Sequence, residues 1–145
     1  MIEFSVKRRI FLIFGIVFLF SACASTVKIG EELSPAELIQ RAQEASDRNR
    51  YKAALQYYEA LLERNRTNID LVITAEYEIA FIHYKQKKYQ QSRSELNAVL
   101  EYYNNPDEEL LPRQFKRLAQ IVLESIEEKE KRAAPFSKKE PKAQE

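Results

Sequence analysis

Glycine and proline are scarce in this chain of 145 residues, which has two glycines and five prolines. Gly15 falls in an apolar N-terminal run, so Gly30 is the one glycine in the remainder. The stretch 36–105 contains neither residue type. β-Turns and hairpins depend on glycine and proline, whereas the residues that dominate here (Ala, Leu, Glu, Gln, Lys and Arg) favour helices. The sequence therefore predicts an all-α fold.

Residue types for catalysis and metal binding are equally scarce. The chain has one cysteine, Cys23, and one histidine, His83. A single cysteine excludes a disulfide within the chain, and these two residues supply neither a zinc ligand set nor a nucleophile with its base. The sequence also has no glycine-rich phosphate loop. We expect no enzyme, no metal and no cofactor, and we expect His83 to be a packed core residue.

The N-terminus has the layout of an export signal. Basic residues at 7–9 precede an apolar run over 10–20, which is too short for a bilayer because a spanning helix needs about 20 residues. Ser21-Ala22-Cys23 follows this run. The ending resembles the lipobox of bacterial lipoproteins, whose cysteine carries a covalent diacylglycerol and becomes the first residue of the mature chain. The alternative is an ordinary secretory signal with a cysteine nearby by chance.

This resemblance implies four segments. They are a signal peptide over 1–22, a lipidated polar tether over 23–33, a helical domain over 34–132 and a disordered charged tail over 133–145. Cleavage before Cys23 leaves 123 residues with a net charge near −1. That length is enough for one domain with a modest core, and the charge balance provides no field that would attract nucleic acid.

Capping residues and helix breakers divide the domain into five helices. Ser34, Pro35 and Glu37 form a helix start with a capping box. Asn68 offers another cap, and Pro112 suits the first turn of the last helix. The predicted helices cover 35–47, 51–65, 89–103 and 112–132, and a further helix starts at the capping residues over 67–70 and ends at 86. A short turn is predicted near 105–110.

The chain repeats itself with a period of about 38 residues. Ala42 aligns with Ala80 and Ala119, and Ala54 aligns with Ser92. Two antiparallel helices approach closely only where small residues face each other, so we expect Ala42 to pack near Ala54 and Ala80 near Ser92. One helix pair cannot bury its apolar face alone, and successive pairs therefore stack.

The segment 76–103 resembles the tetratricopeptide repeat, a helix–turn–helix module of 34 residues. The match is best over 77–89 (YEIAFIHYKQKKY), and it extends over 34–127 as two repeats and a final helix. The resemblance implies antiparallel helix pairs stacked as a short superhelix. A generic five-helix bundle is the alternative, because the period is longer than that of the family and the closing prolines are absent or displaced.

Members of this repeat family bind partners on a concave face lined by the first helix of each pair. By that resemblance, the lining residues here are Ile39, Gln43, Tyr77, Phe81, Tyr84 and Lys85. The three aromatic residues share one helix face, and exposed rings there would suit an apolar peptide or helix. We expect Tyr77 to contact a partner, whereas Phe81 fits partner contact and core packing equally well.

The last helix carries more apolar surface than one packing stripe requires. The stripe consists of Phe115, Leu118, Ala119, Val122 and Ile126. Ile121 and Leu123 widen it. Because repeat arrays usually end in a polar helix, we expect Ile121 and Leu123 to dock on a partner or on a second copy of the chain.

Together, the lipobox and the repeats predict a non-enzymatic adaptor that is lipid-anchored at the periplasmic face of the bacterial outer membrane and binds envelope proteins. Ala24 after the cysteine favours the outer membrane by the enterobacterial sorting rule. The chain resembles a short BamD-like lipoprotein of the β-barrel assembly machinery. The alternatives are an accessory subunit of a cell-wall (peptidoglycan) enzyme and a self-assembling structural lipoprotein.

Overall fold

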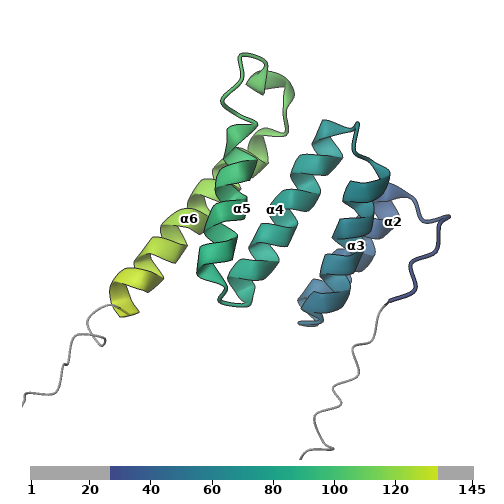
Figure 1. The fold of residues 1–145 in the computed structure, drawn as a ribbon, viewed down its shortest axis with the longest axis horizontal. Coiled ribbons are helices and arrows are strands. Elements are labelled where there is room, and N and C mark those ends of the chain that lie inside the picture. Colours follow the sequence, from purple (N-terminus) through teal and green to yellow (C-terminus); the bar gives the residue numbers. More distant parts are fainter. Residues whose placement is uncertain (1–26, 134–145) are drawn as a thin grey trace, which may run out of the picture.

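The computed structural model describes residues 27–133, which form helices only. The elements are α2 (Pro35–Asp47), α3 (Tyr51–Arg64), α4 (Ile69–Lys85), α5 (Tyr89–Glu101), the short 3₁₀ helix η2 (Glu108–Leu110) and α6 (Arg113–Ala133). They lie side by side in an open row with α2 at one end and α6 at the other (Figure 1). The signal-peptide prediction over 1–22, Cys23 and the tail beyond 133 lie outside the described residues.

Adjacent helices pack as pairs, which confirms the predicted all-α fold of stacked helix pairs. α2 packs on α3 and α4 packs on α5, while α3 and α4 join the two pairs. α6 packs on α5 and on α4. One core cluster lies between α2 and α3 and the other lies among α4, α5 and α6. α4 contributes side chains to both clusters, because it is apolar on nearly every face.

The helix starts use the caps that the sequence predicts. The Ser34 hydroxyl accepts a hydrogen bond from the backbone N–H of Glu37 at 3.3 Å, and the Glu37 carboxylate accepts one from the backbone N–H of Ser34 at 2.9 Å. Asn68 caps α4 by accepting from the backbone N–H of Leu71 at 3.3 Å. Each cap satisfies backbone donors that the first helical turn leaves unpaired.

The turns that follow α2 and α4 have the same backbone geometry at the same 38-residue spacing. Asn49 has φ 56° and Lys87 has φ 62°, the left-handed conformation. The backbone N–H of Arg50 donates to the Ala45 carbonyl at 2.8 Å, and that of Lys88 donates to the His83 carbonyl at 2.9 Å. This is the Schellman pattern of helix ends. The sequence period is therefore also a structural period.

Small residues let the paired helices approach closely, as the sequence predicts. Ala42 and Ala54 are fully buried in the same core cluster between α2 and α3. Ala80 and Ser92 are fully buried where α4 meets α5. A larger side chain at any of the four would force the helices apart or strain the core.

Residues 27–33 form a strap along α3 rather than the free tether predicted for this stretch. The backbone N–H of Val27 donates to the Gln56 side-chain oxygen at 2.9 Å, and the Arg64 guanidinium donates to the Gly30 carbonyl at 3.1 Å. Leu33 is buried in the α2–α3 core, and Ile29 packs against it. The prediction of a tether is therefore wrong for 27–33, because two apolar side chains and two hydrogen bonds hold the segment to α3.

The buried stripe of α6 is narrower than predicted. It consists of Phe115, Ala119, Val122 and Ile126, at spacings of four, three and four residues. Leu118 lies beside this stripe and is 38% exposed, so the prediction that it packs in the core is wrong. Ile121 is 45% exposed. Leu123 is half-buried and packs against the core cluster on one side.

Candidate partner-binding face

A continuous row of aromatic rings follows α4 and extends onto α5 and α6. The ring centroids of Tyr77 and Phe81 lie 6.0 Å apart, and those of Phe81 and Tyr84 lie 5.9 Å apart, with nearly parallel planes. Phe115 of α6 meets Tyr77 at 5.1 Å, and Tyr89 of α5 meets Tyr84 at 6.0 Å. Such spacings are those of favourable aromatic pairs. The row therefore joins three helices through side-chain contacts.

The row passes from the core to the surface. Phe115 is 8% exposed and Tyr77 is 5% exposed, whereas Phe81, Tyr84 and Tyr89 are half-buried. Desolvation by burial raises the pKa of Tyr77 to about 12. The prediction that Tyr77 contacts a partner is wrong, because Phe115 of α6 covers its ring. The outer rings, Phe81 and Tyr84, keep accessible surface.

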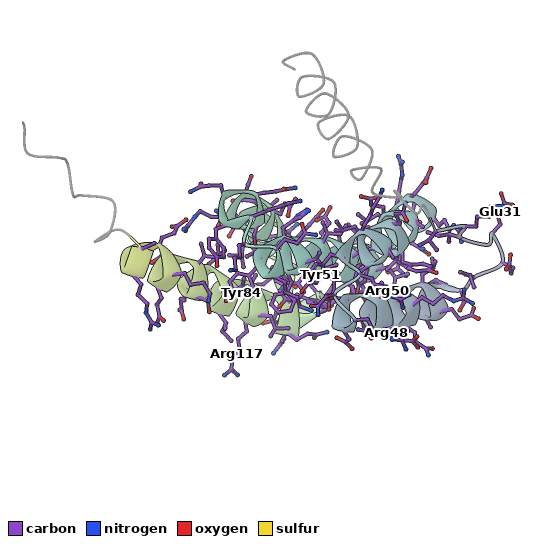
Figure 2. The ribbon with its side chains drawn as sticks, turned by 90° about the horizontal axis from the view of Figure 1, so that it is seen from below. Glu31, Arg48, Arg50, Tyr51, Tyr84 and Arg117 are labelled. Atoms are coloured by element: carbon purple, nitrogen blue, oxygen red, sulfur yellow. The ribbon has the colours of Figure 1, made fainter. Side chains whose placement is uncertain are left out.

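Two lysine ammonium groups lie over the outer rings. The Lys85 Nζ lies 5.1 Å from the Phe81 centroid and 6.0 Å from the Tyr51 centroid, and the Lys129 Nζ of α6 lies 5.8 Å from the Tyr84 centroid. These are cation–π distances. Figure 2 labels Tyr51 close to where the ribbons of α2 and α6 approach each other in that view, and Tyr84 beside α6.

Helix α2 supplies the other wall of this surface. The Lys85 Nζ donates a hydrogen bond to the hydroxyl of the buried Ser46 at 2.9 Å, which fixes the ammonium between α4 and α2. Ile39 and Gln43 precede Ser46 by seven and three residues and share its side of the helix. Ile39 packs against the core and Gln43 is exposed. We call the surface formed by Gln43, Tyr51, Phe81, Tyr84, Lys85 and Lys129 the aromatic face.

The lone histidine packs as the sequence predicts. His83 is 7% exposed, and its Nδ1 lies 2.6 Å from a Glu95 carboxylate oxygen of α5. This contact ties α4 to α5. No group of three or more His, Cys, Asp and Glu side chains within residues 27–133 is arranged to hold a metal ion.

Within residues 27–133, none of the helices α2 to α6 is both long enough and apolar enough to cross a bilayer.

Comparison with known proteins finds a relative whose description gives no function. A protein of Treponema pallidum (strain Nichols), described as uncharacterized, is 36% identical over 124 residues. The match covers 83% of this chain and 49% of that protein, so the chain spans about half the length of the curated relative it matches. No protein-family model matches the chain, and no solved structure matches it.

The sequence analysis missed two members of the aromatic face, Tyr51 and Lys129, and it missed Ser46, which anchors Lys85. Tyr51 and Tyr89 are the first residues of α3 and α5, and their position in the sequence does not indicate contact with α4. Lys129 follows Val122 and Ile126 at helical spacing, so it lies at the end of the buried stripe of α6. That phase was readable from the sequence, but the crossing of α6 over Tyr84 was not.

Proposed function

We propose that this protein is a non-enzymatic adaptor of the bacterial envelope that binds a partner protein on the aromatic face. The observation that carries the proposal is the pair of half-exposed rings, Phe81 and Tyr84, with the Lys85 and Lys129 ammonium groups over them. Tyrosine is one of the residue types that contribute most of the binding energy at protein interfaces.

The chemistry of the aromatic face indicates the kind of segment it would bind. Phe81 and Tyr84 offer flat apolar area to an apolar or aromatic side chain. The two ammonium groups favour a carboxylate next to that side chain. An acidic segment with an apolar anchor, extended or helical, therefore fits the face best. This fits the resemblance to tetratricopeptide scaffolds, whose first helices form the partner-binding surface.

The anchor is the second part of the proposal. The sequence over 7–23 has the layout of a lipoprotein signal, and the proposed modification is a diacylglycerol on Cys23. A lipid would hold the adaptor at high local concentration beside membrane proteins, so that an interface of modest affinity suffices. The outer membrane is the proposed location, and assembly of β-barrel proteins there is one process that such an adaptor would serve.

Site-specific crosslinking tests the aromatic face. A photoreactive phenylalanine analogue at Tyr84, in the native envelope, should capture a defined partner. The same analogue at Tyr57 is the matched control, because Tyr57 is also a half-buried tyrosine but lies on α3. Lys85→Glu should abolish the adduct at position 84 if a carboxylate of the partner lies near the ammonium group. Equal capture at both positions, or no change on Lys85→Glu, contradicts the proposed face.

The anchor has its own test. Cys23→Ala should convert a membrane-associated protein into a soluble form, and membrane association that survives this change contradicts lipidation. The two tests are separable because the crosslink reports on the face and the fractionation reports on the anchor.

Self-association is a second candidate function, favoured by a specific observation. Leu118 and Ile121 lie three residues apart on the outer side of α6 and are 38% and 45% exposed. A second copy would cover both side chains.

A further inference from the structure

Basic residues concentrate where α2 and α4 end and α3 and α5 begin. The turn over 47–52 and the turn over 85–88 together hold six basic residues and one acid, Asp47; the basic residues are Arg48, Arg50, Lys52, Lys85, Lys87 and Lys88. Both turns lie on the same side of the molecule, at the lower ends of the helices in Figure 1. The hydrogen bond from Lys85 to Ser46 links the two turns directly. We call the surface of these two turns the basic end.

Most of these charges are accessible and uncompensated. All except Lys85 are exposed, and Arg48 alone among them pairs with a carboxylate, that of Glu44 at 3.8 Å. For Arg50, Lys52, Lys87 and Lys88 no carboxylate oxygen lies within 4.0 Å in the part of the chain that the structure describes. Figure 2, seen from below, labels Arg48 and Arg50 near one another.

Lys87 has a backbone conformation that favours glycine over lysine. Its φ of 62° is the left-handed conformation, in which glycine is the usual residue at a helix C-terminus. A lysine there costs conformational energy that glycine would avoid. The chain therefore carries a positive charge at a position where the backbone favours no side chain.

At the opposite end of the helices the charges are mixed, because Arg66, Arg113 and Arg117 lie there together with acidic residues. The connection over 101–112 holds four acids and no lysine or arginine; the acids are Glu101, Asp107, Glu108 and Glu109. The last turns of α6 reach the basic end, but there Lys131 pairs with Glu127 at 3.6 Å and Arg132 with Glu128 at 3.4 Å. The positive field thus comes from the two turns, in a chain whose overall charge is close to zero.

The chain enters the described domain close to the basic end. Val27 is hydrogen-bonded to Gln56 and shares a shallow cleft with Arg50. Gln56 lies five residues after Tyr51, the first residue of α3, which is about 8 Å along the helix axis. Cys23 precedes Val27 by four residues, and four residues reach at most about 14 Å. A lipid on Cys23 would therefore keep the basic end within a short distance of the bilayer.

We infer that the basic end is a contact surface for an anionic lipid bilayer. The inference rests on the lipid anchor of the proposed function, since the anchor supplies the proximity and the basic turns supply the orientation. Each Lys or Arg close to an anionic surface strengthens the contact roughly fivefold, and salt weakens it. Docking by this end would leave the connection over 101–112, with its four acids, pointing away from the membrane.

Fluorescence quenching on vesicles tests the orientation with the full, lipidated protein. A cysteine introduced as Gln90→Cys, in the first turn of α5 beside the basic turns, carries a fluorophore. Thr67→Cys, in the turn before α4 at the other end, is the control position, and both residues are exposed. The vesicles contain phosphatidylcholine alone, or with one third phosphatidylglycerol, and a lipid whose headgroup bears a quencher.

We expect quenching at position 90 on vesicles with phosphatidylglycerol, loss of that quenching at high salt, and little quenching at position 67. Replacing Arg50, Lys52 and Lys88 by glutamine should lower the ratio of docked to undocked label by about a hundredfold, from roughly fivefold per charge. The matched control replaces Arg66, Arg113 and Arg117 at the other end by glutamine, and should leave the ratio unchanged.

The outcomes separate the inference from the anchor. Flotation of the protein with the vesicles in a density gradient reports on the anchor. A protein that does not float with either kind of vesicle contradicts the lipid anchor and removes the basis of the inference. A protein that floats but shows equal quenching at positions 90 and 67, or quenching that does not depend on phosphatidylglycerol, overturns the inference alone. An equal loss of quenching with both triple variants overturns it as well, because the effect would then reflect overall charge.

Discussion

The Ser92 hydroxyl donates a hydrogen bond to the Ala80 carbonyl at 2.8 Å, in the fully buried contact between α4 and α5. The corresponding place in the first helix pair is occupied by Ala54, 38 residues earlier, beside Ala42. One pair therefore closes on a hydrogen bond and the other on two methyl groups. The comparison gives an internal control for the value of this bond.

Ser92→Ala should lower the free energy of unfolding by about 1 kcal/mol, the net value of one hydrogen bond. Ser92→Leu should lower it by about 1–3 kcal/mol, because the extra atoms overpack the contact between α4 and α5. The reciprocal change Ala54→Ser should cost less than Ser92→Leu, since the same geometry provides an acceptor. Urea unfolding followed by circular dichroism measures all three. A Ser92→Leu variant as stable as wild type would contradict close packing at this point.

Replacing Lys87 by glycine should stabilise the protein by about 0.5–1 kcal/mol, because glycine adopts positive φ without a steric cost. Asn49→Gly should have a smaller effect, since asparagine tolerates the left-handed conformation better than lysine. Thermal unfolding of the two single variants provides the comparison. A loss of stability in Lys87→Gly would indicate that the lysine makes a favourable contact that outweighs its backbone cost.

Glu78 of α4 should make stability depend on pH. Desolvation by burial raises the pKa of its carboxyl group, with a further rise from Asp47 and an opposing effect from Lys85. A raised pKa means that the folded state favours the protonated form, so Glu78 contributes stability at low pH and loses it as the pH rises through the folded-state pKa.

Glu78→Gln should therefore be more stable than wild type at pH 7, and the two should converge below about pH 4, where the carboxyl group is neutral even in the unfolded chain. Chemical unfolding at a series of pH values measures the difference. Glu63→Gln, an exposed position on α3, is the control and should change stability little. A difference between Glu78→Gln and wild type that does not vary with pH would exclude the carboxyl group as its source.

Self-association through α6 predicts that the double variant Leu118→Glu with Ile121→Lys is a monomer under conditions in which the wild type is not. Sedimentation velocity of the detergent-solubilised protein measures this. Leu110→Lys is the control, because Leu110 is 81% exposed but lies on η2, away from the outer side of α6. Identical sedimentation of wild type and the double variant would exclude this surface as an interface between copies.

The helices were predictable because their ends carry local signals. Ser34 with Glu37 begins α2, Asn68 begins α4 and Pro112 precedes α6, so each boundary follows from residues within one turn of it. The small residues at spacing 38 were equally readable, because the close approach of two helices demands them.

The side on which each helix is covered was harder to predict. α4 is apolar on nearly all sides, so its periodicity gives no preferred phase, and only the contact with Phe115 of α6 decides that Tyr77 is buried. Leu118 and Leu123 lie on opposite flanks of the buried stripe of α6, and small differences in helix rotation decide which flank is covered. The strap over 27–33 was missed because its three apolar residues, Val27, Ile29 and Leu33, form no helical pattern.

The aromatic row also gives this protein a built-in optical reporter. The chain has eight tyrosines and no tryptophan, so its ultraviolet fluorescence comes from tyrosine. Tyr89, Tyr84 and the buried Tyr77 belong to one run of rings that touch through Phe81. A quenching group on a ligand seated at Tyr84 should therefore reduce emission from neighbouring tyrosines along the row, and binding becomes measurable without labelling the protein.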